Sequence, residues 1–190
     1  MNLKYFYLIA ATLLTFTAYS QEEIAVDFKY QGTHNVDLSS LRSPIRIAEF
    51  TDGRNIENPR LITTSDLGKT SASNGYQAEL PLPEIIRDAL VQGFQHGGAT
   101  LVDTADNMSI VGNLLASEAT LVDREGVQSI QITLRTNIQL QGDGRTIWQT
   151  TLFGRGIAPV TEGLAAAIHA ALDRTVRELV GDNYFLLEVQ

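Results

Sequence analysis

Cysteine is absent from this sequence of 190 residues. Without cysteine the folded protein forms no disulfide, so its stability depends on an apolar core, and redox chemistry through thiols is excluded. A bacterial lipoprotein carries its lipid on a cysteine directly after the signal sequence, and Gln21 stands at that position here. The sequence therefore predicts no lipid anchor.

Basic residues are also scarce. The chain has 14 Lys and Arg against 22 Asp and Glu, a formal net charge of −8, and its arginines are scattered along the sequence. Proteins that bind nucleic acid or anionic lipid usually concentrate positive charge on one stripe or face. We therefore expect no nucleic-acid partner.

No apolar run is long enough to cross a membrane. The run from Tyr5 to Phe16 is about twelve residues, whereas a spanning helix needs roughly 20. Lys4 precedes this run, and the small residues Ala18 and Ser20 stand three and one positions before Gln21. This layout is typical of a cleavable secretory signal. We predict that residues 1–20 are a signal peptide and that the protein is exported to the periplasm or beyond, with no transmembrane segment after cleavage.

The rest of the chain, 21–190, has a length that suits one domain. Alternating or continuous apolar residues predict strands at 24–30, 45–50, 99–102 and 109–122. The segment from about 51 to 81 shows no periodicity and is rich in turn formers and hydroxyl residues, so we predict a long loop there.

Two main helices are predicted from apolar residues at helical spacing. The first begins at Pro83, with Glu84 in its first turn, and ends at Gly97 and Gly98. The second is capped by Thr161 and ends at Gly181. The tail, 183–190, is expected to lie against the core as strand or helix.

The clearest signal is the alternation from Ile130 to Leu140, which predicts a strand with one buried and one wet face. Gly142-Asp143-Gly144 predicts a hairpin turn into a strand over 146–154, and Gly154-Arg155-Gly156 is interpreted as a turn and bulge signal. The predicted fold class is α+β, a mixed and mostly antiparallel sheet with a three-strand meander and two main helices on one face. The other face is expected to be wet or occupied by a partner.

Three stretches give the chain a family resemblance: IRIAEFTDGRN, LPEIIRDALVQGFQHGGATLV and TEGLAAAIHAALDRTVREL. Together they resemble the YajG-type family of bacterial envelope lipoproteins over roughly Ile45 to Leu187. The resemblance implies a small envelope protein without enzymatic activity. The chain departs from the family in lacking the lipid-bearing cysteine.

Residues for catalysis or metal binding are few. The histidines are His34, His96 and His169, and no GxSxG motif accompanies them, so no nucleophilic centre is predicted. The acidic pairs Asp103 with Asp106 and Asp123 with Glu125 lie in predicted turns, where aspartate usually bonds to its own backbone. We predict no metal, no cofactor and no enzymatic activity.

Four residues are candidates for a binding site. Asp52-Gly53-Arg54-Asn55 either forms a turn in which Arg54 pairs locally, or presents Arg54, and Arg60 beyond it, to a carboxylate of a partner. Trp148 is an interface candidate if its indole is exposed, and otherwise packs under the final helix.

These observations lead to one functional hypothesis and two alternatives. The leading hypothesis is a non-catalytic exported protein that binds another envelope component, or itself, as an adaptor. The first alternative is a hydrolase of an envelope substrate that uses Glu49 and Asp52, which requires both acids in one concave pocket. The second is a small-molecule carrier, which requires an apolar cavity of roughly 300 to 1,000 Å³ between helices and sheet.

Overall fold

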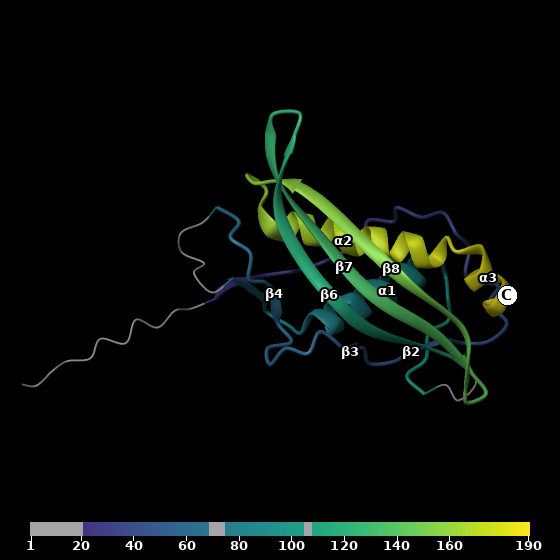
Figure 1. Ribbon diagram of the computed structural model, residues 1–190. Helices are drawn as coiled ribbons and strands as arrows, with labels where there is room; N and C mark the ends of the chain where they lie inside the picture. Colours follow the sequence, from purple (N-terminus) through teal and green to yellow (C-terminus); the bar gives the residue numbers. More distant parts are fainter. Residues whose placement is uncertain (1–20, 69–74, 105–107) are drawn as a thin grey trace, which may run out of the picture.

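The computed structural model describes residues 21–68, 75–104 and 108–190. Within these residues the chain forms a large curled sheet, a small sheet and three helices (Figure 1). The predicted signal peptide, Asp106 and part of the predicted loop lie outside the described residues.

The large sheet is built on the predicted meander. Strands β6 (Met108–Arg124), β7 (Val127–Gly142) and β8 (Arg145–Pro159) pair antiparallel in sequence order. Two short strands, β2 (Arg46–Ile47) and β3 (Thr51–Asp52), pair in parallel with the first part of β6. The tip of the β6–β7 hairpin extends past the end of β8 (Figure 1). The structure thus confirms the α+β class with a mixed, mostly antiparallel sheet.

The small sheet collects segments that are far apart in sequence. Its order is β1 (Glu22–Ile24), β5 (Tyr76–Ala78) and β4 (Leu61–Thr63), with β1 parallel and β4 antiparallel to β5. Arg60 ties this sheet together, because its guanidinium donates from Nε to the Ala78 carbonyl at 2.7 Å and forms an ion pair with Glu23.

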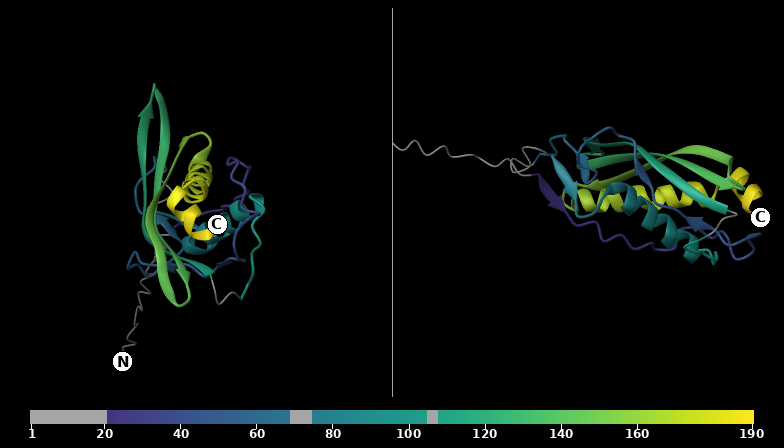
Figure 2. Two further views of the ribbon diagram at one scale, coloured as in Figure 1. Left: turned by 90° about the vertical axis from the view of Figure 1, so that its right-hand side faces the viewer. Right: turned by 90° about the horizontal axis from the view of Figure 1, so that it is seen from below.

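The helices α1 (Leu82–His96) and α2 (Gly163–Val180) cover one face of the large sheet (Figure 2, left). The alternation along β7 explains why, since its apolar residues are buried on that face and the polar residues between them point to the other side. The short helix α3 (Asn183–Val189) follows α2 and is capped by Asp182, whose carboxylate accepts from the Phe185 amide.

Glycine in β8 brings α2 unusually close to the sheet. A Cβ at Gly156 would overlap the backbone of Ala167 and Ala171, and one at Gly154 would lie 2.7 Å from the Ala171 carbonyl oxygen. Both glycines lie inside β8, so their interpretation as a turn and bulge signal was wrong. They are needed for close helix-to-sheet packing.

Several predicted boundaries differ from the structure. The strand expected at 24–30 ends at Ile24, the one expected at 45–50 reduces to β2, and the one at 99–102 is a single bridge between Leu101 and Ile45. The N-cap of α2 is Glu162 rather than Thr161, without a side-chain cap. The segment 51–81 contains β3, β4 and β5, which are too short to show periodicity in sequence.

Candidate functional site

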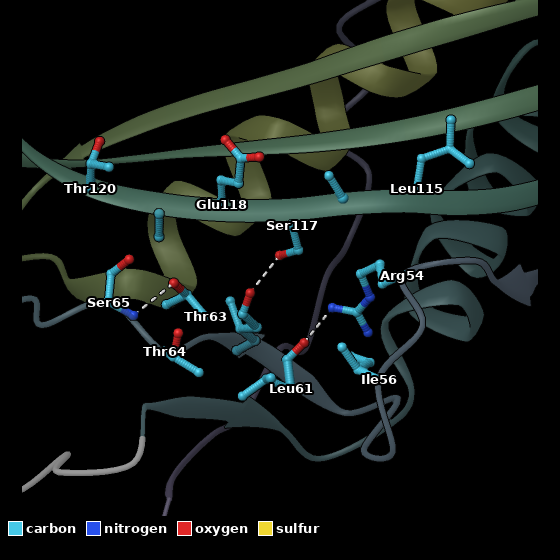
Figure 3. A pocket seen from close by; sticks show the side chains of 13 residues that line it. Arg54, Ile56, Leu61, Thr63, Thr64, Ser65, Leu115, Ser117, Glu118 and Thr120 are labelled. Carbon is cyan, nitrogen blue, oxygen red and sulfur yellow. Dashed lines mark hydrogen bonds between the residues drawn. The ribbon is translucent and has the colours of Figure 1, made fainter.

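An open groove separates β4 from the outer edge of β6 (Figure 3). We call it the β4–β6 groove, and its volume is about 430 Å³. Hydroxyl, aliphatic and charged side chains share its walls. It is lined by Arg54, Ile56, Leu61, Ile62, Thr63, Thr64, Ser65, Leu115, Ala116, Ser117, Glu118, Ala119 and Thr120.

The groove exists because the outer edge of β6 is paired over half its length only. Strand β3 pairs with β6 as far as Leu114, where the Gly53 amide donates to the Leu114 carbonyl at 2.8 Å. A bulge follows at Leu115, and beyond it no described strand pairs with this edge. The Ser117 hydroxyl, which donates to the Ile62 carbonyl at 2.7 Å, holds the two walls together (Figure 3).

Arg54 closes one end of this groove, and its guanidinium is bound within its own loop. Nε and Nη2 donate to the two carboxylate oxygens of Asp52 at 2.9 and 2.6 Å. Nη1 and Nη2 also donate to the carbonyls of Leu61 and Pro59. Four of its five N–H groups are therefore used, and only 7% of the side chain is exposed. The geometry favours the local-pairing interpretation of Arg54 over presentation to a partner.

Asp52 is correspondingly held in its ionised form. Burial, the largest single influence, raises the pKa of this carboxyl, but the hydrogen bonds from the Arg54 side chain and amide and the charge of Arg54 together lower it below 3.8. A carboxylate in this state accepts hydrogen bonds and does not donate a proton near neutral pH.

A second groove, of about 480 Å³, lies on the other side of Asp52. It brings Glu49 and Asp52 together, as the hydrolase alternative requires, and adds Glu84 and Arg87 from α1. Since both Asp52 oxygens are bound to Arg54, Asp52 is poorly suited to act as the general acid of such a pair. We call this second groove the acidic groove.

The other two predicted site residues lie elsewhere. Arg60 belongs to the small sheet, where it binds Ala78 and Glu23. Trp148, in β8, is half-buried and its ring meets that of Phe185 in α3 edge to face, with centroids 5.2 Å apart. The sequence therefore identified two paired residues that line different grooves, Arg54 in the β4–β6 groove and Asp52 in the acidic groove, and two residues that stabilise the fold.

The histidines serve packing. His34 is buried, its Nε2 bonds to the Gly93 carbonyl at 2.9 Å and its Nδ1 accepts from the Val36 amide at 3.2 Å. Its ring and those of Tyr30 and His96 lie with centroids 5.3 to 5.4 Å apart. This cluster could not be predicted from the sequence, because His96 lies far along the chain from Tyr30 and His34.

Two further findings concern the remaining alternatives. An apolar pocket of about 250 Å³ lies where both sheets meet α2, lined in part by Ile24, Ile130 and Leu164, and is smaller than the cavity expected for a carrier. Asp123, once considered as a metal ligand, accepts a hydrogen bond from the Gly126 amide in its own turn. In residues 21–68, 75–104 and 108–190 we find neither a group of three potential metal ligands nor a helix able to cross a membrane.

No protein-family model matches the sequence, and no curated protein matches it. Among solved structures, the chain is similar to a protein from Xanthomonas campestris that matches the family model DUF330, with a TM-score of 0.59 and 19% identity over 84% of this chain and 92% of that one. A minor lipoprotein from Acinetobacter baumannii has 13% identity and a TM-score of 0.41 over 56% of this chain and 87% of its own.

A homologue of a putative neuraminyllactose-binding hemagglutinin from Helicobacter pylori has 8% identity and a TM-score of 0.45 over 87% of this chain and 96% of its own. The Acinetobacter and Helicobacter similarities are too weak to carry an argument. The resemblance to the YajG-type family stays a prediction from the sequence. What the comparisons establish is that this chain has the fold of the Xanthomonas protein.

Proposed function

We propose that this protein is an exported, non-catalytic module of the bacterial cell envelope that binds another envelope protein through the β4–β6 groove. The observation that carries the proposal is the open groove beside a strand edge with which no described strand pairs beyond Leu115. Unpaired strand edges are surfaces that another polypeptide chain readily uses.

The walls of the groove suit binding. Ile56 and Leu115 offer apolar surface, and the hydroxyls of Thr64, Ser65 and Thr120 offer hydrogen bonds. The Arg54–Asp52 pair and the Ser117 bond hold the walls in place before a partner arrives, which lowers the entropic cost of binding.

The charged groups of the groove support a binding role over catalysis. Glu118 is the acidic residue among those that line it, and Arg54 is already neutralised by Asp52. Glycoside hydrolysis uses two carboxyl groups positioned on either side of the bond, and the lining supplies one.

Site-specific photocrosslinking in the producing cells tests this proposal. A photoreactive phenylalanine analogue at Leu115 or Thr120 is expected to give a discrete crosslinked species, identifiable by mass spectrometry as an envelope protein. The matched control carries the analogue at Arg174, on the exposed side of α2, and is expected to give none. Equal crosslinking at all three positions, or none at Leu115 and Thr120, would refute the proposal.

Export is tested separately. The intact mass of the protein recovered from the periplasm is expected to correspond to a chain that begins at Gln21. Recovery of the protein with residues 1–20 still attached, or in the cytoplasm, would overturn this part of the proposal.

One observation favours the hydrolase alternative, namely that Glu49 and Asp52 line the same acidic groove. If this groove is catalytic, Glu49→Gln abolishes release of soluble fragments from purified envelope material, while the binding proposal expects no release by the wild-type protein. The release assay thus separates the two functions.

A further inference from the structure

Strand β8 forms one border of the large sheet, and its outer edge is unpaired among the described strands. The sheet order places β7 on one side of β8, and no described strand lies on the other. Its 15 residues extend about 50 Å, and alternate residues direct their N–H and C=O groups away from β7. The one backbone hydrogen bond that a described residue makes to this outer edge is at its end, where the Glu162 amide donates to the Pro159 carbonyl at 2.9 Å.

Natural proteins protect such edges with short strands, lysines, prolines or covering loops. β8 is long, has no lysine, and has its one proline, Pro159, at its last position. The edge is therefore open to pairing with another strand.

The side chains beside this edge form a distinct surface. Phe153 is 51% exposed and lies directly opposite Arg135 of β7 on the outer face of the sheet. Two positions along, Arg155 lies opposite Thr133. An exposed aromatic ring flanked by two guanidinium groups is typical of an interface and unusual on a free surface.

The arginines of this surface form no ion pairs with described residues, although Glu118 of β6 lies on the same face, opposite Thr133. All four arginines of the meander, Arg124, Arg135, Arg145 and Arg155, are exposed, and none forms an ion pair with a described residue. Of the other arginines, Arg54, Arg60, Arg87, Arg174 and Arg177 pair with carboxylates, whereas Arg42 and Arg46 form no ion pair with a described residue. Positive charge is thus left unpaired beside β8, in a chain whose net charge is −8.

We propose that the outer edge of β8 is a docking site for an extended polypeptide segment that carries acidic side chains at alternate positions. Its backbone would continue the sheet, and its carboxylates would lie on the outer face beside Arg135 and Arg155, with Phe153 between them. This surface is separate from the β4–β6 groove, and the inference does not depend on the groove's function.

A second copy of the chain fits the edge less well than an acidic segment. β8 contains Arg145 and Arg155 and no aspartate or glutamate, so pairing two β8 strands would bring four arginines together without a carboxylate. Anionic lipid is disfavoured by the acidic net charge of the molecule, which repels such a surface.

Backbone NMR of the isotopically labelled mature chain tests the proposal. The probes are a capped synthetic peptide of alternating valine and glutamate and a matched peptide with lysine in place of glutamate. We expect the glutamate peptide to shift the amide resonances of alternate β8 residues. It should also protect these amides from hydrogen exchange. The lysine peptide should bind at least about tenfold more weakly.

Variants identify the side chains responsible. Replacing both Arg135 and Arg155 with glutamine should weaken glutamate-peptide binding by at least about tenfold. The charge-matched control, Arg174→Gln with Arg177→Gln on the exposed side of α2, should leave it unchanged. Because all four arginines are exposed or half-exposed, these variants are expected to fold.

Several outcomes would overturn the proposal. The first is equal affinity for the glutamate and lysine peptides. The second is amide shifts confined to β6, and the third is unchanged glutamate-peptide binding when Arg135 and Arg155 are both replaced. Dimerisation that by itself protects the β8 amides would assign the edge to a second copy. Binding of vesicles containing anionic phospholipid, lost on the same double substitution, would assign the arginines to lipid.

Discussion

Gly156 in β8 lies directly against the backbone of Ala167 in α2, with no room for a side chain between them. We expect Gly156→Ala to lower the free energy of unfolding by about 3 kcal/mol, since the added Cβ meets backbone that cannot rotate away. Urea unfolding of the purified protein measures this loss.

The control for this prediction is Gly126→Ala. An added Cβ there meets no atom within 4 Å, although the backbone φ of +82° makes alanine strained. Its expected cost is about 1 kcal/mol. Equal losses at the two positions would contradict the close contact between Gly156 and α2.

Replacing Arg54 tests its role in holding the groove wall. Arg54→Ala removes the guanidinium donors to the Asp52 carboxylate and to the Leu61 and Pro59 carbonyls, and we expect a loss of about 2 to 3 kcal/mol. Asp52 and Pro59 each keep one backbone amide donor, from residue 54 and from Leu82. Hydrogen exchange should show lost protection in 52–61. Arg174→Ala, which breaks an exposed pair with Glu178, should cost less than about 0.5 kcal/mol. A similar small effect at Arg54 would contradict the arrangement seen here.

Asp52 should make stability depend on acidity. Its folded-state pKa lies below 3.8, despite the opposing effect of burial, because of its bonds and charge interaction with Arg54. The unfolded chain therefore takes up this proton first as the pH falls, so the stabilisation is present above about pH 4 and is lost below it. Asp52→Asn should flatten this part of the pH profile of stability, and an unchanged profile would contradict the assignment.

His169 should also make the stability depend on pH, in a higher pH range than Asp52. Burial, which exceeds the opposing effect of Asp27, lowers its pKa from 6.5, so the folded state favours the neutral ring. The unfolded chain binds the proton more readily, so stability falls as the pH drops below about 6.5. His169→Gln should remove this decrease. Melting temperatures of the wild type and the variant, measured between pH 8 and pH 5, show whether the decrease is present in the wild type and absent in the variant.

Trp148, the only tryptophan in the chain, reports on the docking of α3. Phe185→Ala removes the buried ring that meets its indole, so we expect a loss of about 3 to 5 kcal/mol and a red shift of the fluorescence. Tyr184→Ala, at a neighbouring residue that is 77% exposed, should change neither quantity. A red shift in both variants would place the indole in contact with Tyr184 instead.

The meander and the two long helices could be predicted because their apolar periodicity extends over many residues. The alternation from Ile130 to Leu140 fixes both the strand and its buried face, and the stripe that includes Ile86, Leu90 and Phe94 does the same for α1. The short strands could not be predicted. β2 and β3 have two residues each, and their pairing with β6 depends on where the rest of the fold places that strand.

The candidate site was predicted in part. The sequence identified Asp52 and Arg54 but left open whether Arg54 pairs locally, because spacing does not reveal the carbonyls of Pro59 and Leu61 that complete its bonding. It misread Gly154 and Gly156, since a turn and a close helix contact both require the absence of a Cβ. It gave no sign of the free edge of β8, which is a property of sheet order.

The parallel pairing of β2 and β3 with β6 sets the order in which the chain can fold. Ile47 and Thr51 find their partners at Ile110 and Asn113, and Glu22 finds its partner at Tyr76. Strands β1, β2 and β3 therefore pair only after later parts of the sequence have been synthesised. Such a polypeptide has little long-range native structure to undo while its C-terminal half is still being made, and this property supports the proposed export of the chain before it folds.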